Sequence, residues 1–253
     1  MRTETIDIAV DDGASIEGTL VLPDGVAVRR PGVLFVHGWG GNQDQYLATA
    51  REVAALGSVC LTFDLRGHGE TDELHETVTR ADGVRDVMAA YEVLAAHRDV
   101  DRARIAVVGA SYGAYLAAIV SLRCRFNRFA LRAPALYKDD DWDMPKRKLH
   151  VDPDFKEYRR RSLRIEDNRA LGACAQFRGD VLLVESSADE IIPHPAVANY
   201  IAAFANAHSL TYRVIEGADH GVTQAPWQLA YDDLLVEWLS TISVDTRRTL
   251  GLA

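Results

Sequence analysis

The chain has 253 residues, of which 48% are hydrophobic and 26% are charged. This is an ordinary globular composition, so it argues against a disordered, collagen-like or coiled-coil protein. The length accommodates one α/β domain or two small domains. With 28 basic and 37 acidic residues, the formal net charge is −9. That balance argues against nucleic acid as the main partner and against a polybasic membrane anchor.

The N-terminal stretch MRTETIDIAV is charged and then alternating, without the apolar segment of a secretory signal. No apolar run approaches the roughly 18 residues that a transmembrane helix needs. The three cysteines, Cys60, Cys124 and Cys174, are far apart and form no CxxC pair. We therefore expect a cytoplasmic protein with buried, reduced thiols, and the spacing offers no zinc site.

The first predicted elements form a β-hairpin. Residues 4–10 and 16–22 alternate between polar and apolar side chains around the turn Asp11-Asp12-Gly13. Short apolar runs that predict strands buried on both faces then recur along the chain. They occupy residues 32–36, 58–63, 104–108, 128–131, 181–184 and 211–215.

Segments with helical spacing separate these runs. They cover residues 44–56, 81–97, 112–122, 195–206 and 225–241. An alternation of strand and helix builds a mainly parallel sheet with helices on both faces and right-handed crossovers. No internal repeat or flexible linker appears, so we expect a single α/β domain over residues 1–253, with a twisted sheet of about eight strands.

One stretch interrupts the alternation. Residues 138–169 carry 19 charged residues among 32 and lie between two predicted core strands. They form either a solvent-exposed helical insertion or a small cap over the strand ends. The two interpretations are compatible, because the outer face of a cap is exposed to solvent. The candidates for an inner face are Trp142, Phe155, Tyr158 and Leu163.

The clearest chemical signal is the segment Gly109-Ala110-Ser111-Tyr112-Gly113, which fits G-x-S-x-G. A predicted strand precedes it and a predicted helix follows it, which is the context of a nucleophile elbow. Small residues are needed on either side of the serine because the chain approaches itself closely there. The turn holds the Ser111 hydroxyl above the strand ends, at the positive end of the following helix.

A serine hydroxyl needs a base to become a nucleophile, and the base needs an acid that orients it. On an open sheet of this kind the chain order is serine, acid, histidine. His220 follows the last predicted strand and is the expected base, ahead of His150, His194 and His208. The loop after residues 181–184 supplies the acid, for which Asp189 is the first choice and Glu190 the second.

The tetrahedral intermediate needs two N–H donors for its oxyanion. We expect one from the backbone of Tyr112, directly after the nucleophile. The other is expected from the backbone of Trp39, in the loop His37-Gly38-Trp39-Gly40-Gly41 after the first buried strand. His37 precedes the serine and sits at a strand end, so we expect it to hold this loop rather than to act as the base.

Taken together, these residues resemble the α/β-hydrolase fold superfamily, and most of all its small bacterial esterases and dienelactone-hydrolase-like members. The matching segments, which span nearly the whole chain after residue 30, are VLFVHGWGG, FDLRGHGET, IAVVGASYGAY, SADEIIP and GADHG. Two positions depart from the family pattern: Ala114 follows Gly113 where a second glycine is frequent, and Thr71 stands where a serine is frequent.

The leading hypothesis is a serine hydrolase that cleaves a carboxylic ester through an acyl-enzyme on Ser111, with His220 as base and Asp189 as orienting acid. A thioesterase or small acyl-peptidase with the same triad is the first alternative. A non-hydrolytic ligand-binding or acyl-transfer protein is the second. The resemblance implies no metal and no cofactor.

The substrate is expected to be a small ester-type molecule, with no nucleic acid or membrane partner, and a homodimer is possible. Aromatic side chains near the predicted oxyanion hole suggest contacts from Trp39, Tyr115 and Trp142, although these rings can equally serve packing. Basic residues of the 138–169 segment either attract an anionic substrate or form a solvated face: Lys146, Arg147, Lys148 and Arg159 to Arg161.

Overall fold

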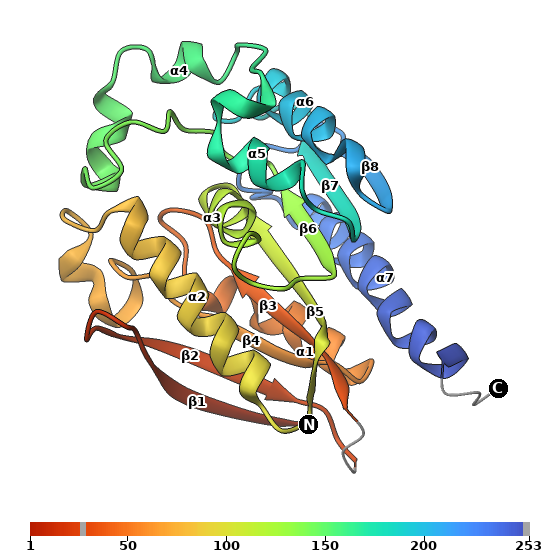
Figure 1. Ribbon diagram of the computed structural model, residues 1–253. Coiled ribbons are helices and arrows are strands. Elements are labelled where there is room, and N and C mark those ends of the chain that lie inside the picture. The colour runs from red at the N-terminus through yellow and green to blue at the C-terminus, as the bar shows by residue number, and fades with distance from the viewer. Residues whose placement is uncertain (26–28, 250–253) are drawn as a thin grey trace.

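The computed structural model describes residues 1–25 and 29–249, with the side chains of residues 150 and 243–249 outside this description (Figure 1). Its centre is one sheet of eight strands in the order β1-β2-β4-β3-β5-β6-β7-β8. The strands are β1 (Arg2–Ala9), β2 (Ser15–Leu22), β3 (Arg30–Val36), β4 (Val59–Phe63), β5 (Val100–Ala110), β6 (Arg128–Arg132), β7 (Asp180–Ser186) and β8 (Ser209–Ile215).

The sheet is parallel except at one edge. β1 and β2 form the predicted antiparallel hairpin, and β2 pairs antiparallel with β4. All pairs from β4 across to β8 are parallel. The predicted α/β fold with about eight strands is therefore confirmed.

Helices cover both faces of the sheet (Figure 1). Side chains of a strand point alternately to opposite faces, and β3 shows the result. Val33 and Phe35 pack with α1 (Leu47–Ala55) and α7 (Ala225–Thr249) on one face. Leu34 and Val36 join the core on the other face. That second layer consists of α2 (Arg80–Ala96), α3 (Tyr112–Val120), α5 (Arg169–Cys174) and α6 (His194–Ala203).

Two helices differ from the sequence prediction. The sequence does not predict the short α5, because it begins at the last residue of the charged stretch and its six residues are too few to show a helical period. α7 extends beyond the predicted end at residue 241. The three cysteines are buried free thiols. None of the described helices is long and apolar enough to span a membrane.

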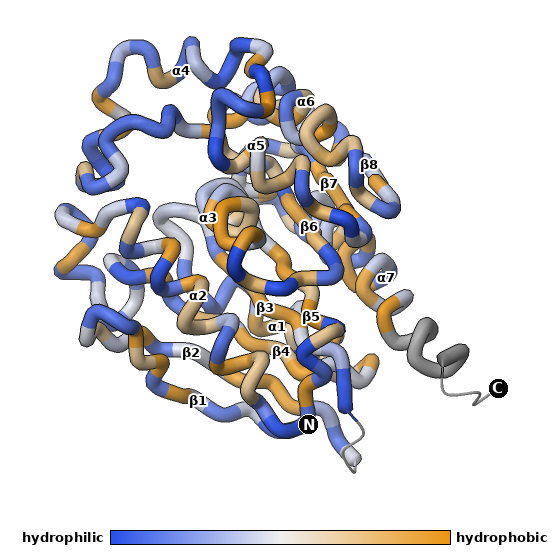
Figure 2. The backbone as a smooth tube through the Cα atoms, in the orientation of Figure 1, coloured by the Kyte–Doolittle hydropathy of each residue, from blue (hydrophilic) through white to orange (hydrophobic). Residues whose placement is uncertain are grey.

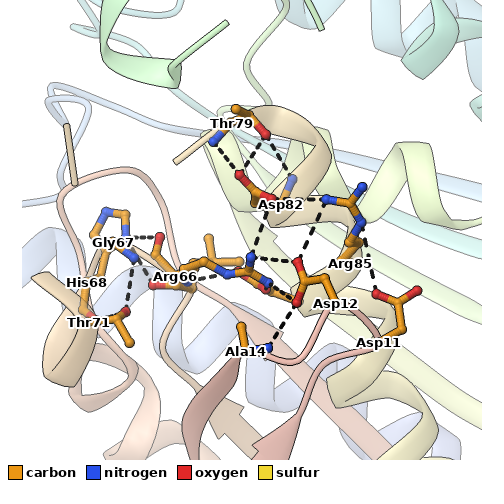
Figure 3. A network of polar contacts seen from close by, with 12 residues as sticks. Asp11, Asp12, Ala14, Arg66, Gly67, His68, Thr71, Thr79, Asp82 and Arg85 are labelled. Atoms are coloured by element: carbon orange, nitrogen blue, oxygen red, sulfur yellow. Dashed lines mark hydrogen bonds and ion pairs between the residues drawn. The ribbon is translucent and has the colours of Figure 1, made fainter. Parts of the chain in front are cut away.

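A network of ion pairs ties the β1–β2 turn to the loop after β4 and to the start of α2 (Figure 3). At its centre, the Arg66 guanidinium lies 2.7 Å from carboxylate oxygens of Asp12 and Asp86 and 3.4 Å from one of Asp82. Asp82 and Thr79 also form a capping box that starts α2. Three segments far apart in the chain are thereby locked together.

The 138–169 segment is mostly hydrophilic (Figure 2). It contains short helices only: η3 (Lys146–Val151), α4 (Phe155–Tyr158) and η4 (Ile165–Asp167). Each residue proposed for its inner face packs against the core, Tyr158 fully and the others partly: Trp142, Phe155 and Leu163.

Two cations of this segment are buried. Neither of the two interpretations of its basic residues, a solvated face or an attraction for an anionic substrate, predicts this burial. Lys146 is fully buried, and Arg159 is 3% exposed. Arg159 donates to the carbonyls of Leu136 and Ile191. Burial is possible because backbone carbonyls and aromatic rings surround these charges.

Candidate active site

Ser111 lies between the last residue of β5 and the first residue of α3. Its backbone has φ +51° and ψ −113°, a strained conformation for a residue with a side chain. Two glycines make the turn sterically possible. A Cβ atom at Gly109 would stand 2.7 Å from the backbone of α3, and one at Gly113 would stand 2.3 Å from the carbonyl oxygen of Val36. This is the geometry that the G-x-S-x-G spacing predicts.

The structure brings Ser111, His220 and Asp189 into one hydrogen-bonded chain. His220 Nε2 lies 3.0 Å from Ser111 Oγ, and His220 Nδ1 lies 2.7 Å from Asp189 Oδ2. The other oxygen of Asp189 accepts the amides of Ile191 and Ile192 at 2.8 and 2.7 Å. A carboxylate at Nδ1 keeps the proton there, which leaves Nε2 to accept the serine proton.

The alternative residues lie elsewhere. His194 Nδ1 is 3.0 Å from Glu185, and His208 Nδ1 is 2.7 Å from Asp180. Both rings are largely exposed, at 64% and 79%. The side chain of His150 is outside the described residues. Glu190 is exposed next to the buried Asp189 carboxylate.

The loop after β3 approaches the elbow closely. A Cβ atom at Gly38 would stand 3.4 Å from Ser111 Cβ, and the Gly41 amide donates to the Gly38 carbonyl at 3.1 Å. This turn carries the amide of Trp39. Tyr112 is the first residue of α3, so its amide has no acceptor within the helix. The role of the Trp39 and Tyr112 amides as oxyanion donors stays a prediction.

Two buried histidines hold this loop. His37 Nε2 accepts the Leu65 amide at 2.9 Å, and His37 Nδ1 donates to the Gly38 carbonyl at 2.8 Å. Burial lowers the pKa of His37 to about 4, so the ring is neutral and suited to this pair of bonds. His68 Nε2 accepts the Gly40 amide at 3.0 Å. The contact from His68 was not foreseen, although the GHG segment that contains it was recognised.

Thr71 supports the same region. Its hydroxyl donates to the His68 carbonyl and accepts the Gly67 amide, both at 3.0 Å. The hydroxyl of Thr71 therefore takes the place of the hydroxyl of the serine that is frequent at this position in the family.

Lys146 connects the 138–169 segment to the predicted oxyanion residues. Its Nζ atom lies 4.3 Å from the ring centroid of Trp39, 5.0 Å from that of Tyr112 and 5.3 Å from that of Tyr137. Burial, together with the charges of Arg159 and Arg80, lowers the pKa of Lys146 to about 7. A cation over three rings fixes the rings relative to one another.

A pocket of about 430 Å³ opens at Ser111 and His220. The glycine-rich loop forms one wall, and α1 and the start of α7 form the others. The polar side chains that line the pocket are Gln45 and Tyr46 just before α1, Thr49 on α1, Arg132 at the end of β6, and Gln228, Tyr231 and Asp232 on α7. No described residue of the 138–169 segment lines this pocket. The segment contacts the site through Lys146, which lies over the rings of Trp39 and Tyr112.

The three predicted substrate contacts have different locations. Trp39 lines the pocket. Tyr115 is fully buried and packs against Tyr112 and Tyr137. Trp142 lines a separate hollow of about 640 Å³ between α2, α3 and α5, where Arg80 and Arg169 cover its ring. Neither Tyr115 nor Trp142 lines the catalytic pocket, so both rings contribute packing around the site.

Comparisons with known proteins agree with the fold. The model of the alpha/beta hydrolase family matches residues 33–233. The uncharacterized protein Rv2307c of Mycobacterium tuberculosis is 28% identical over 192 residues, which cover 75% of this chain. The chain matches only 63% of that relative's length.

Solved structures share the architecture at low sequence identity. Est1E from Butyrivibrio proteoclasticus, solved with ferulic acid, has a TM-score of 0.71 and 17% identity, with 95% of this chain and 98% of Est1E covered. Dienelactone hydrolase from Anabaena variabilis has a TM-score of 0.66 and 18% identity, with 94% and 96% covered. Dipeptidyl peptidase 4 from Porphyromonas gingivalis has a TM-score of 0.67 and 21% identity. The match covers 94% of this chain but only 35% of the peptidase. Because the family model matches most of the length of this chain, the chain belongs to the alpha/beta hydrolase family.

Proposed function

We propose that this protein is a serine hydrolase that cleaves carboxylic esters. The observation that carries the proposal is the continuous hydrogen-bonded chain from Asp189 through His220 to Ser111, at the mouth of a pocket large enough for a small substrate. The chain order and the hydrogen bonds of these three side chains support a nucleophile, a base and an orienting acid for serine hydrolysis.

In the first half of the reaction, Ser111 Oγ attacks the acyl carbon while His220 Nε2 takes its proton. The amides of Trp39 and Tyr112 stabilise the negative oxygen of the tetrahedral intermediate. The C–O bond to the leaving group then breaks, and His220 gives its proton to the departing alcohol. The acyl group remains bound to Ser111.

In the second half, His220 takes a proton from water, and the resulting hydroxide attacks the acyl carbon. The bond to Ser111 breaks, the serine recovers its proton from His220, and the carboxylic acid leaves. Asp189 remains ionised throughout and stabilises the imidazolium form of His220.

A fluorophosphonate probe tests the nucleophile. The wild-type protein should be labelled, and Ser111→Ala should not. Ser121→Ala, at the opposite end of α3, is a matched control that should be labelled like the wild type. Absence of labelling in the folded wild type would rule out an activated serine and favour a ligand-binding role.

A substrate panel then separates the reaction classes. Carboxylic esters, thioesters and aminoacyl amides of the same acyl group are compared by kcat/KM. The proposal expects the esters to be cleaved and His220→Ala to abolish this activity. Cleavage of thioesters or amides alone would replace the esterase proposal by the thioesterase or the peptidase alternative.

A further inference from the structure

The catalytic pocket has a polar wall that the chemistry at Ser111 does not use. Arg132, the last residue of β6, accepts the Ser111 amide on its carbonyl at 2.9 Å, so its backbone adjoins the nucleophile. Tyr231 and Asp232 belong to α7. All three side chains line the pocket.

The Arg132 guanidinium is only partly satisfied by the protein. Its Nη1 atom donates to the His220 carbonyl at 2.5 Å, and its Cζ atom lies 5.4 Å from the Tyr231 ring centroid. Its Nε atom is buried without a hydrogen-bond partner in the described part of the chain. Within that same part, no carboxylate oxygen lies within 4.0 Å of this guanidinium. Arg132 is partly buried, and a positive charge that lines a pocket without a carboxylate in contact favours an anionic ligand.

Tyr231 offers a further donor beside this charge. The residue is 5% exposed, and its buried hydroxyl has no partner among the residues that the structure describes. Burial raises the pKa of Tyr231, so the phenol keeps its proton at all physiological pH values. Arg132 can only donate to this hydroxyl, so the phenolic hydrogen has no acceptor in the described part of the protein and can be donated to an oxygen atom of a ligand.

Asp232 faces the same pocket but does not neutralise Arg132 by contact. One of its carboxylate oxygens accepts the Thr49 hydroxyl at 2.9 Å. Burial raises the pKa of Asp232, against the opposing effects of Thr49 and Arg132.

We infer that the preferred substrate is an ester that carries a second, ionised carboxyl group, which binds the Arg132 guanidinium with the Tyr231 hydroxyl as an additional donor. The inference rests on the proposed ester hydrolysis and names its substrate class. Hydrogen bonds between ions of opposite charge are stronger than neutral ones. A site built for a polar group also discriminates strongly against an analogue that lacks the group.

Two pairs of esters of matched shape test this inference. Ethyl hydrogen succinate and ethyl 4-methylpentanoate differ by a carboxylate in place of an isopropyl group on the acyl side. The salt 3-acetoxypropanoate and 3-methylbutyl acetate differ in the same way on the alcohol side. In at least one pair, kcat/KM for the carboxylate ester should exceed that for its partner by about tenfold or more.

The variants are judged by this ratio within a pair, because Arg132 also holds the His220 carbonyl. Arg132→Gln should lower the ratio by about tenfold or more, and Arg132→Lys should retain part of it. Tyr231→Phe should lower it about threefold. Arg213→Gln, an exposed substitution on β8 with the same change of charge, should leave the ratio at its wild-type value.

Lack of any preference in the wild type, or a preference that survives Arg132→Gln, would overturn the inference. The inference would also be overturned if the fluorophosphonate labelled Ser111 but the enzyme cleaved none of the four esters. If Arg132→Gln does not fold, the wild-type preference and Tyr231→Phe decide. Failure of the proposed function is distinct, because Ser111 would then resist the fluorophosphonate.

Discussion

Replacement of Gly113 by alanine tests how closely the elbow depends on its neighbours. The new Cβ atom would stand 2.3 Å from the carbonyl oxygen of Val36 and 2.4 Å from that of His37, so α3 would have to retreat by about 1.1 Å to restore ordinary contact at 3.4 Å. The helix has no free space behind it, since Leu116 is fully buried. Overpacking costs up to about 3 kcal/mol, and the better helix propensity of alanine returns about 1 kcal/mol.

We therefore expect Gly113→Ala to lose about 2 kcal/mol in the free energy of unfolding. For a chain of this size the melting temperature should fall by roughly 4–8 °C, which thermal unfolding followed by circular dichroism measures. Gly172→Ala is the matched control in α5. Its Cβ atom would meet only the Ile165 carbonyl oxygen at 3.6 Å, so the melting temperature should stay the same or rise.

The same displacement should impair the site. A shift of about 1 Å in a catalytic group can cost about 100-fold in rate. The fluorophosphonate should therefore label Ser111 roughly 100-fold more slowly in Gly113→Ala than in Gly172→Ala. A Gly113→Ala protein that melts at the wild-type temperature and reacts at the wild-type rate would refute this account of the elbow.

Three further substitutions test other parts of the structure. Asp189→Asn should lower kcat about 10⁴-fold, because an amide no longer fixes the His220 tautomer; steady-state ester hydrolysis with kcat within tenfold of wild type would contradict this. Arg66→Met should lower the free energy of unfolding in urea by about 3–5 kcal/mol, since the fully buried Asp86 loses its cation; a loss below about 1 kcal/mol would show that the pair is dispensable. Lys146 has a pKa of about 7 in the folded protein against about 10.4 when unfolded, so its charge destabilises the fold fully below pH 7 and less as the pH rises. The free energy of unfolding of the wild type relative to Lys146→Met should therefore rise by roughly 3 kcal/mol from pH 6 to pH 9, and a pH-independent difference would contradict the assignment.

Much of the site could be predicted from local sequence because its chemistry depends on strand ends. The C-terminal ends of parallel strands lie at the same edge of the sheet. Residues just after β5, β7 and β8 therefore lie close together, whatever their separation along the chain. Ser111, Asp189 and His220 each follow one of these strands, and in the structure His220 lies within hydrogen-bond distance of both Ser111 and Asp189. The glycine spacing around Ser111 is likewise a local steric requirement.

The side chains that surround the site could not be assigned this way. The contact from His68 to Gly40 joins residues 28 positions apart, and no periodicity reports which backbone amide a buried ring will meet. Tyr115 is close to the elbow in sequence, and Trp142 was expected to approach it. In the structure Tyr115 is buried in the core, and Trp142 lines a separate hollow. Aromatic character alone does not distinguish a substrate contact from a packed ring.

The sequence by itself determined the alternation of strands and helices, the elbow at Ser111 and the residues that follow the strand ends, because these are patterns of neighbours along the chain. Only the tertiary structure decided that α1 and α7 wall the pocket, that Lys146 lies buried against Trp39, and that Arg132 faces the pocket with part of its guanidinium unpaired. These are contacts between distant segments. Their energies depend on burial and on the partners that the fold brings together.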